Sequence, residues 1–248
     1  SNQEIGHITG SLVWAWTFKP LWSPLLETSN NKRFFVILFQ IIGGVTLGLI
    51  ALALQFPKPL TVIIALFGVL AVASATHDIA ADGLYIASLS TKDQTDYAGW
   101  QGAFYNASKF VISGGLVVLA GHLENQAHFS IEATWTIIFL IMSVGLTGIG
   151  AYHVWALPKA TGEIQSKISI SSAFGTLLDV LADFFKKKGV WLSIAFILLF
   201  RAGEAQVSTI APLFLLDPRS SGGLGLTTAE VGWAYGAAGT IAFIAGSI

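Results

Sequence analysis

Seven apolar segments constrain the fold of this chain more than any other feature of its sequence, because each is long enough to cross a lipid bilayer. A membrane-spanning helix needs about 20 mostly apolar residues. The segments cover residues 5–26, 34–56, 60–87, 99–121, 134–157, 190–216 and 230–248. Only 11% of all residues are charged, whereas soluble domains carry roughly 25%. The sequence therefore predicts an all-α, polytopic membrane bundle.

Basic residues in the connecting loops predict the orientation of the bundle, because lysine and arginine concentrate in short cytoplasmic loops. One alternate set of loops covers 27–33, 88–97 and 158–189, and the other set has only Lys58 and Arg219 as basic residues. The first set has eight: Lys32, Arg33, Lys92, Lys159, Lys167, Lys186, Lys187 and Lys188. This bias places the first set in the cytoplasm and the start of the chain outside.

The loop 158–189 is unlike the others because a polar, Ser/Lys-rich stretch is followed by an amphipathic one. Apolar side chains recur there at helical spacing beside two aspartates: Leu177, Leu178, Leu181, Phe184 and Phe185 lie beside Asp179 and Asp183, with Lys186–Lys188 following. Two interpretations stay open, an interfacial helix on the cytoplasmic face or a linker with one helical turn packed on the bundle. Either one divides the chain into 1–157 with five spans, the linker 158–189, and 190–248 with two spans.

The third apolar segment contains a histidine and two carboxylates, His77, Asp78 and Asp82. Ionisable groups in a span are expensive and usually mark a functional pathway. The two aspartates are four residues apart, so they lie on one helical face and repel each other. Either a cation neutralises them or one keeps its proton, which would suit a proton carrier. The alternative is that both lie hydrated at the cytoplasmic end and serve helix packing.

Two other spans carry cations near their middle. Lys109 needs a carboxylate partner or an anionic ligand at that depth, and Asp78 and Asp82 on the preceding span are its nearest candidates by connectivity. Arg201 and Glu204 are three residues apart, which allows an ion pair within one helix. That pair either satisfies itself or binds an acid and passes protons in a water-lined cavity.

Several uncharged and terminal groups are weaker candidates. Tyr105 and Asn106 add hydrogen-bonding groups beside the mid-span lysine, and Gln40 is expected to bond across helices. Lys19 lies near the inner end of the first span, where it either snorkels to the headgroups or contacts the solute. Pro20, one residue later, is expected to kink or end this helix.

The sequence contains no sign of a metal site or a bound cofactor. It has no cysteine, and its five histidines follow no metal-ligand spacing. It has neither a phosphate-binding P-loop nor the motifs of zinc proteases and serine hydrolases. The net charge of −1 gives no argument for nucleic acid. We therefore expect no metal, no cofactor, no nucleic-acid partner and no enzymatic activity.

Three stretches match a known pattern. They are Phe-Lys-Pro-Leu-Trp-Ser-Pro-Leu-Leu-Glu at 18–27 followed by Asn31, Lys32, Arg33 and Gln40; Thr-His-Asp-Ile-Ala-Ala-Asp-Gly-Leu-Tyr-Ile at 76–86; and Phe-Arg-Ala-Gly-Glu at 200–204 running on to Pro-Leu-Phe-Leu at 212–215. Together they resemble AmpG-type muropeptide permeases, a branch of the major facilitator superfamily related to acetyl-CoA transporters. His77 stands where that branch commonly has glutamine, and Arg201 and Glu204 stand where it commonly has lysine and aspartate.

The resemblance implies a fold of twelve helices in two halves of six. The seven segments would then be the second to the eighth helix, and 158–189 would join the halves. The chain would be a fragment of that fold. The orientation deduced from the basic residues agrees, since the second helix of such a carrier starts outside.

We therefore expect a proton-coupled permease of the bacterial inner membrane, working by alternating access around a site at the bilayer midplane. The resemblance implies import of a sugar–peptide wall fragment, by a monomer when complete. The proton carriers would be Asp78, Asp82 and Glu204, with Lys109 and Arg201 holding anionic groups and Lys19, Gln40, Tyr105, Asn106 and His77 as further solute contacts. Two alternatives are an intramembrane enzyme using His77, Asp78 and Asp82, and a receptor-like membrane protein without transport.

Overall fold

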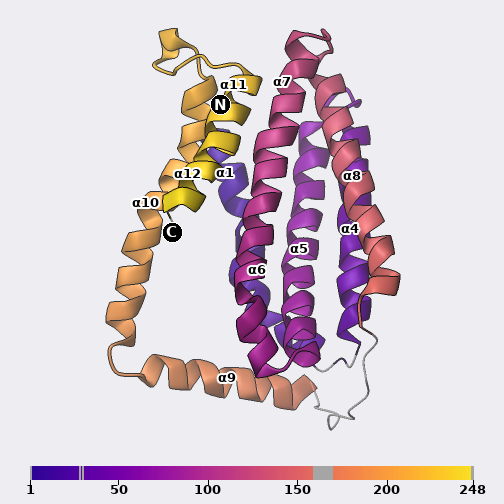
Figure 1. Ribbon diagram of the computed structural model, residues 1–248. Helices are drawn as coiled ribbons and strands as arrows, with labels where there is room; N and C mark the ends of the chain where they lie inside the picture. The colour runs from indigo at the N-terminus through magenta and orange to yellow at the C-terminus, as the bar shows by residue number, and fades with distance from the viewer. Residues whose placement is uncertain (1, 28, 30, 159–169, 247–248) are drawn as a thin grey trace.

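The computed structural model describes residues 2–27, 29, 31–158 and 170–246, and every regular element in them is helical (Figure 1). The elements in chain order are α1 (Asn2–Leu12), α2 (Trp14–Phe18), η1 (Lys19–Leu21), α3 (Ser23–Glu27), α4 (Lys32–Ala53), α5 (Leu60–Ser88), α6 (Thr91–Lys109), η2 (Phe110–Leu116), α7 (Val117–Asn125), α8 (Ile131–Ala156), α9 (Ile170–Lys186), α10 (Val190–Leu216), η3 (Arg219–Ser221), α11 (Thr228–Val231), η4 (Gly232–Ala238) and α12 (Gly239–Gly246). The expected all-α bundle is confirmed.

Five helices in the described residues are long and apolar enough to cross a membrane. They are α4, α5, the continuous helix Thr91–Asn125 formed by α6, η2 and α7, α8, and α10. They correspond to the predicted spans 34–56, 60–87, 99–121, 134–157 and 190–216. The protein is therefore a multi-pass membrane protein.

The first predicted span, 5–26, is not one continuous helix. It consists of the short elements α1, α2, η1 and α3. Pro20 lies at the start of the 3₁₀ turn η1 and Pro24 lies in α3, and a proline inside a helix removes one backbone hydrogen bond and clashes with the preceding turn. Pro20 thus interrupts the helix as the sequence predicts, and the broken segment still packs along α5.

The last predicted span, 230–248, begins two residues earlier than expected, at Thr228. The side chain of Thr227 accepts a hydrogen bond from the backbone N–H of Glu230, and the Glu230 carboxylate accepts one from the backbone N–H of Thr227 at 2.8 Å. This capping box satisfies two donors at the start of the helix. The helix then continues through the π-helical η4 into α12, and residues 247–248 lie outside the described part.

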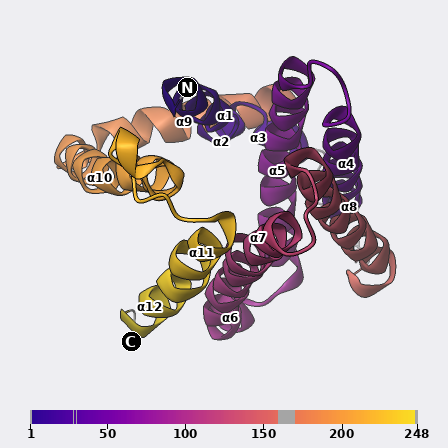
Figure 2. The same ribbon diagram turned by 90° about the horizontal axis from the view of Figure 1, so that it is seen from above.

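The core of the bundle is built around α4, which packs against α5 on one side and α8 on the other (Figure 2). Its buried residues include Val36, Gln40, Gly43, Leu47 and Ile50. Their alternating spacing of four and three places them on one face of the helix. Small residues within this face let the helices approach closely, which is the main source of packing energy between helices in lipid.

A second close contact joins the front group of helices (α1–α8) to the rear group (α10–α12). The π-helical segments η2 and η4 pack against each other, and α11 packs against α7 (Figure 2). Glycines make this possible, because a Cβ on Gly232 would lie 2.8 Å from the Val118 nitrogen, and one on Gly114 would lie 3.2 Å from the Ala237 nitrogen. At the outer end, the Thr228 hydroxyl donates to the Glu124 carboxylate at 2.8 Å.

The amphipathic stretch of the connecting loop forms α9, a helix of 17 residues. A helix of this length contradicts the interpretation of 158–189 as a linker with one helical turn. Figure 1 shows α9 lying crosswise below the bundle, at the end where the loop after α5 also lies. The basic residues assign that loop to the cytoplasm. The polar part of the connection, with Lys159 and Lys167, lies outside the described residues.

Candidate functional site

An ion pair between Lys19 and Asp78 is the clearest polar contact between elements of the predicted spans. The Lys19 nitrogen Nζ lies 2.5 Å from the Asp78 oxygen Oδ2, and the two side chains are 32% and 48% exposed. Lys19 belongs to the 3₁₀ turn η1, where the broken first segment passes alongside α5. The interruption thus directs Lys19 toward α5, and whether its ammonium also reaches the headgroups or contacts a solute stays a prediction.

This pairing corrects the predicted partner of Asp78. Lys109 forms no ion pair with any carboxylate that the structure describes. Its ammonium lies over the ring of Tyr105 on its own helix, 5.0 Å from the ring centroid. Such cation–π contacts stabilise a charge when no carboxylate is at hand. The prediction failed because order along the chain does not decide which faces of two helices meet.

Asp82 lies one helical turn after Asp78 on the same face of α5, and it is exposed. No lysine or arginine among the described residues lies within ion-pair distance of it. The side chain of Lys32 packs over Gly83, where a Cβ would lie 2.9 Å from the Lys32 Cδ atom. The two carboxylates of α5 therefore have different surroundings, and among the described residues only Asp78 has a cationic ion-pair partner.

A second polar cluster is buried among α4, α5 and α8. The Gln40 side chain is 8% exposed, and its oxygen Oε1 lies 2.7 Å from the His153 ring nitrogen Nδ1. The bond across helices that the sequence predicts for Gln40 is confirmed. The Nε2 atom of His77 is buried and has no hydrogen-bond partner in the described part of the chain. Sequence reasoning missed His153, although its position in an apolar span was a visible signal.

The same cluster borders a cavity of about 360 Å³. Gln40 and His77 are polar residues of its wall, and Trp16, Phe39 and Ala71 are among the apolar ones. A cavity lined mostly by apolar groups with a few polar ones is typical of a site for small molecules. His77 thus belongs to the wall of this cavity, and its buried Nε2 atom has no hydrogen-bond partner among the described residues.

The Gln40–His153 bond leads to a testable expectation for stability. We expect Gln40→Leu to lower the free energy of unfolding, because it leaves the His153 ring unpaired. A double-mutant cycle with His153→Phe should give a coupling of about 0.6–1.7 kcal/mol, the range of polar contacts between membrane helices. Thermal melting of the purified protein in detergent measures it.

A matched control lies at the other end of α4 and α8. Gln55 donates to Thr136 at 2.8 Å in an exposed position. Because water can replace that bond, Gln55→Leu should change stability by only a few tenths of a kcal/mol. A coupling at Gln40–His153 no larger than that of the exposed pair would contradict a structural role for the buried one.

Other predicted site residues lie apart from these clusters. On α6, Asn106 donates to the Gly102 carbonyl at 2.9 Å and Tyr105 is 62% exposed. On α10, Arg201 is exposed, whereas the side chain of Glu204 lies outside the described atoms. The ion pair between Arg201 and Glu204, and the solute contacts of Lys109, Tyr105 and Asn106, stay predictions.

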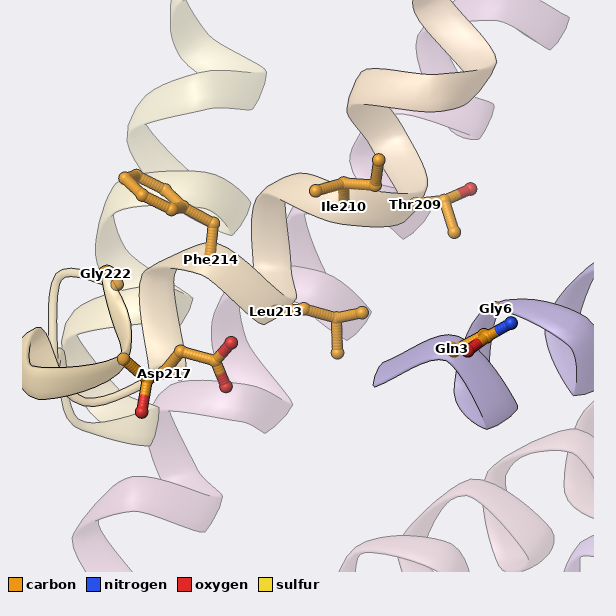
Figure 3. A pocket seen from close by; sticks show the side chains of 10 residues that line it. Gln3, Gly6, Thr209, Ile210, Leu213, Phe214, Asp217 and Gly222 are labelled. Carbon is orange, nitrogen blue, oxygen red and sulfur yellow. The ribbon is translucent and has the colours of Figure 1, made fainter. Parts of the chain in front are cut away.

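A cavity of about 400 Å³ lies between α1 and α10 (Figure 3). Gln3 and Gly6 line it from α1, and Thr209, Leu213 and Asp217 line it from α10 and its end. Figure 3 shows the Leu213 side chain directed toward Gln3 across the gap. Sequence reasoning did not foresee this crevice, because it forms only where the front and rear groups meet.

Comparison with known proteins gives relatives over most of the chain. A putative transporter AmpG 4 of Rickettsia conorii is 24% identical over 229 residues, which cover 88% of this chain and 51% of the relative. The anhydromuropeptide permease of Escherichia coli K12 is 26% identical over 244 residues, which cover 94% of this chain and 45% of the relative. No family model matches the chain, and no solved structure matches it.

These relatives are named as transporters and a permease, and none of these names is that of an enzyme. The chain spans about half the length of the curated relatives it matches. Sequence similarity, helical architecture and the matched motifs agree with one another. The chain is therefore related to the AmpG-type permease branch of the major facilitator superfamily.

Proposed function

We propose that this protein is a proton-coupled secondary transporter of a polar or anionic solute, residing in a bacterial inner membrane. The observation that carries the proposal is the Lys19–Asp78 ion pair, which joins two elements of the predicted spans while both side chains stay partly open to solvent. Charged groups inside membrane bundles mark the paths of ions and solutes. The names of the relatives support the same class of function.

The pair suggests how a proton and an anionic solute are coupled. While Asp78 is ionised, it holds Lys19 at 2.5 Å. A proton on Asp78 removes the negative charge and leaves the Lys19 ammonium without a partner. A carboxylate of the solute then takes its place, because an ammonium without a counter-charge among membrane helices is costly. Proton and anionic solute therefore bind together, which is the requirement for symport.

The remaining residues receive supporting roles in this scheme. Asp82 and Glu204 are the alternative proton carriers, and Lys109 and Arg201 are further cations for anionic groups. The polar side chains of Gln40, His77, Tyr105 and Asn106 complete the path. Movement of the front group against the rear group would expose this path to each side of the membrane in turn.

The solute class follows from the named relatives. One of them is an anhydromuropeptide permease, so we propose a peptidoglycan-derived sugar–peptide as the solute of this protein. Such a molecule carries peptide carboxylates that suit Lys19, together with many hydroxyl and amide groups. We propose that the complete protein works as a monomer.

Uptake into proteoliposomes tests this function. The complete protein is reconstituted and supplied with a radiolabelled anhydromuropeptide under a pH difference of one unit, alkaline inside. For one proton per solute we expect roughly tenfold accumulation, since each 1.4 kcal/mol corresponds to a factor of ten. A protonophore should abolish it. Uptake that is the same with and without the gradient would reject proton coupling, and no uptake would reject this solute.

The enzyme alternative has no comparable support. No group of three or more histidine and acidic side chains in the described residues is placed to hold a metal ion. Asp78 is engaged by Lys19 instead of approaching His77 as a ligand partner. The arrangement of Asp78 with Lys19 therefore supports the proposed transport function more than an active site on α5.

A further inference from the structure

The helix α9 presents an apolar face that stays largely exposed in the described part of the structure. Leu178 is 65% exposed and Val180 is 59% exposed, and Leu181, Phe184 and Phe185 are exposed as well. These five residues, here called the α9 apolar face, follow one another at helical spacing. Asp179 and Asp183 lie on the opposite side of the helix. Exposed apolar surface of this size and regularity marks contact with another phase or partner.

The position of α9 agrees with an in-plane location at the surface of the membrane. It lies crosswise to the spanning helices at the end of the bundle that the basic loops assign to the cytoplasm (Figure 1). It contacts α3, and its end turns into α10 through Gly189, which has a positive φ of 81°. Glycine adopts this conformation without strain. The turn brings the Phe185 and Trp191 rings to 5.5 Å from each other.

The end of α9 carries a cluster of positive charge. Lys186, Lys187 and Lys188 are consecutive and exposed. Lys186 lies 3.3 Å from Asp183, which offsets part of its charge. Neither Lys187 nor Lys188 forms an ion pair within the described part of the chain. Trp191 follows three residues after Lys188, and tryptophan favours the headgroup level of a bilayer.

We propose that α9 lies in the cytoplasmic leaflet with the α9 apolar face among the acyl chains, and that Lys186–Lys188 bind the headgroups of acidic phospholipids. The charge of the cluster is complementary to an anionic lipid surface, and α9 runs crosswise to the spanning helices, as a helix in the plane of such a surface does. Two contacts thereby anchor the linker between the front and rear groups. The α9 apolar face contacts the acyl chains, and Lys186–Lys188 contact the headgroups. This site is separate from the transport path and does not depend on it.

Single cysteines provide the test, because residues 1–248 contain none, and any cysteine elsewhere in the complete protein is first replaced by serine. Leu181→Cys on the α9 apolar face and Asp179→Cys on the opposite side are each labelled with a nitroxide in the complete protein in nanodiscs. In discs with 30% phosphatidylglycerol, the label at 181 should collide mainly with lipid-dissolved oxygen. The label at 179 should collide mainly with a water-soluble nickel complex. In a pure phosphatidylcholine disc, this difference should shrink.

The lysine cluster is tested by the triple change Lys186→Gln, Lys187→Gln and Lys188→Gln. We expect about fivefold weaker binding of phosphatidylglycerol for each exposed lysine removed, from the effect of one basic residue at an anionic surface. Lys58→Gln with Arg219→Gln, at the opposite end of the bundle, is the control and should leave binding unchanged. A label at 181 that neither oxygen nor nickel reaches would show that protein covers the face and would overturn the proposal. Equal access of nickel to both labels, or unchanged lipid binding in the triple variant, would do the same.

Discussion

Replacing Gly236 by alanine should abolish solute uptake and lower the melting temperature of the protein. Gly236 lies in η4, where a Cβ would lie 2.5 Å from the Cα atom of Gly114 in η2. Because the neighbouring atoms belong to the backbone, they cannot turn away as a flexible side chain would. The two helices must separate, and overpacking of this kind typically destabilises by about 1–3 kcal/mol. Since this contact joins the front and rear groups, their relative movement should be impaired as well.

Gly115 provides the matched control for this prediction. It lies beside Gly114 in the same π-helical segment, yet a Cβ there would meet nothing within 4 Å. Gly115→Ala should therefore leave uptake unchanged and keep the melting temperature or raise it slightly, because alanine favours a helix more than glycine does. Uptake in proteoliposomes and thermal melting in detergent measure both variants. Equal behaviour of the two would mean that the close contact between η2 and η4 does not matter.

Asp78→Asn should separate solute movement from the proton gradient. The asparagine amide is neutral, so it resembles the protonated aspartate and leaves Lys19 available for an anionic solute at every pH. We expect the variant to lose the roughly tenfold accumulation under a one-unit pH difference. Exchange of external for internal solute should continue, because exchange requires no net proton movement. Wild-type exchange should decline as the pH rises, whereas exchange by the variant should be nearly independent of pH.

Two further variants assign the roles within this site. Lys19→Gln removes the cation and should abolish both accumulation and exchange. Asp82 lies on the same face of α5 but has no cationic partner among the described residues. The Asp82→Asn variant should therefore still accumulate solute under the pH difference. If Asp82→Asn lost accumulation and Asp78→Asn kept it, the proton would be carried by Asp82, and the proposed competition for Lys19 would be wrong.

Hydrophobic patterning alone predicted most of the architecture. The five spanning helices and the amphipathic α9 lie where the apolar periodicity places them, because in a membrane each helix must satisfy its own backbone and expose mainly apolar side chains to lipid. The interruption near Pro20 was also expected from chain chemistry, since proline cannot donate the hydrogen bond that a helix interior requires. These properties belong to each segment by itself.

The partners of the polar side chains were decided by the tertiary structure. Asp78 pairs with Lys19 and not with Lys109, although the sequence identified all three as candidates. Gln40 finds its partner in His153, 113 residues further along the chain. A sequence shows which groups are expensive to place in lipid, because that depends on the residue type. It does not show which helix faces meet, because those contacts depend on how the helices pack in space.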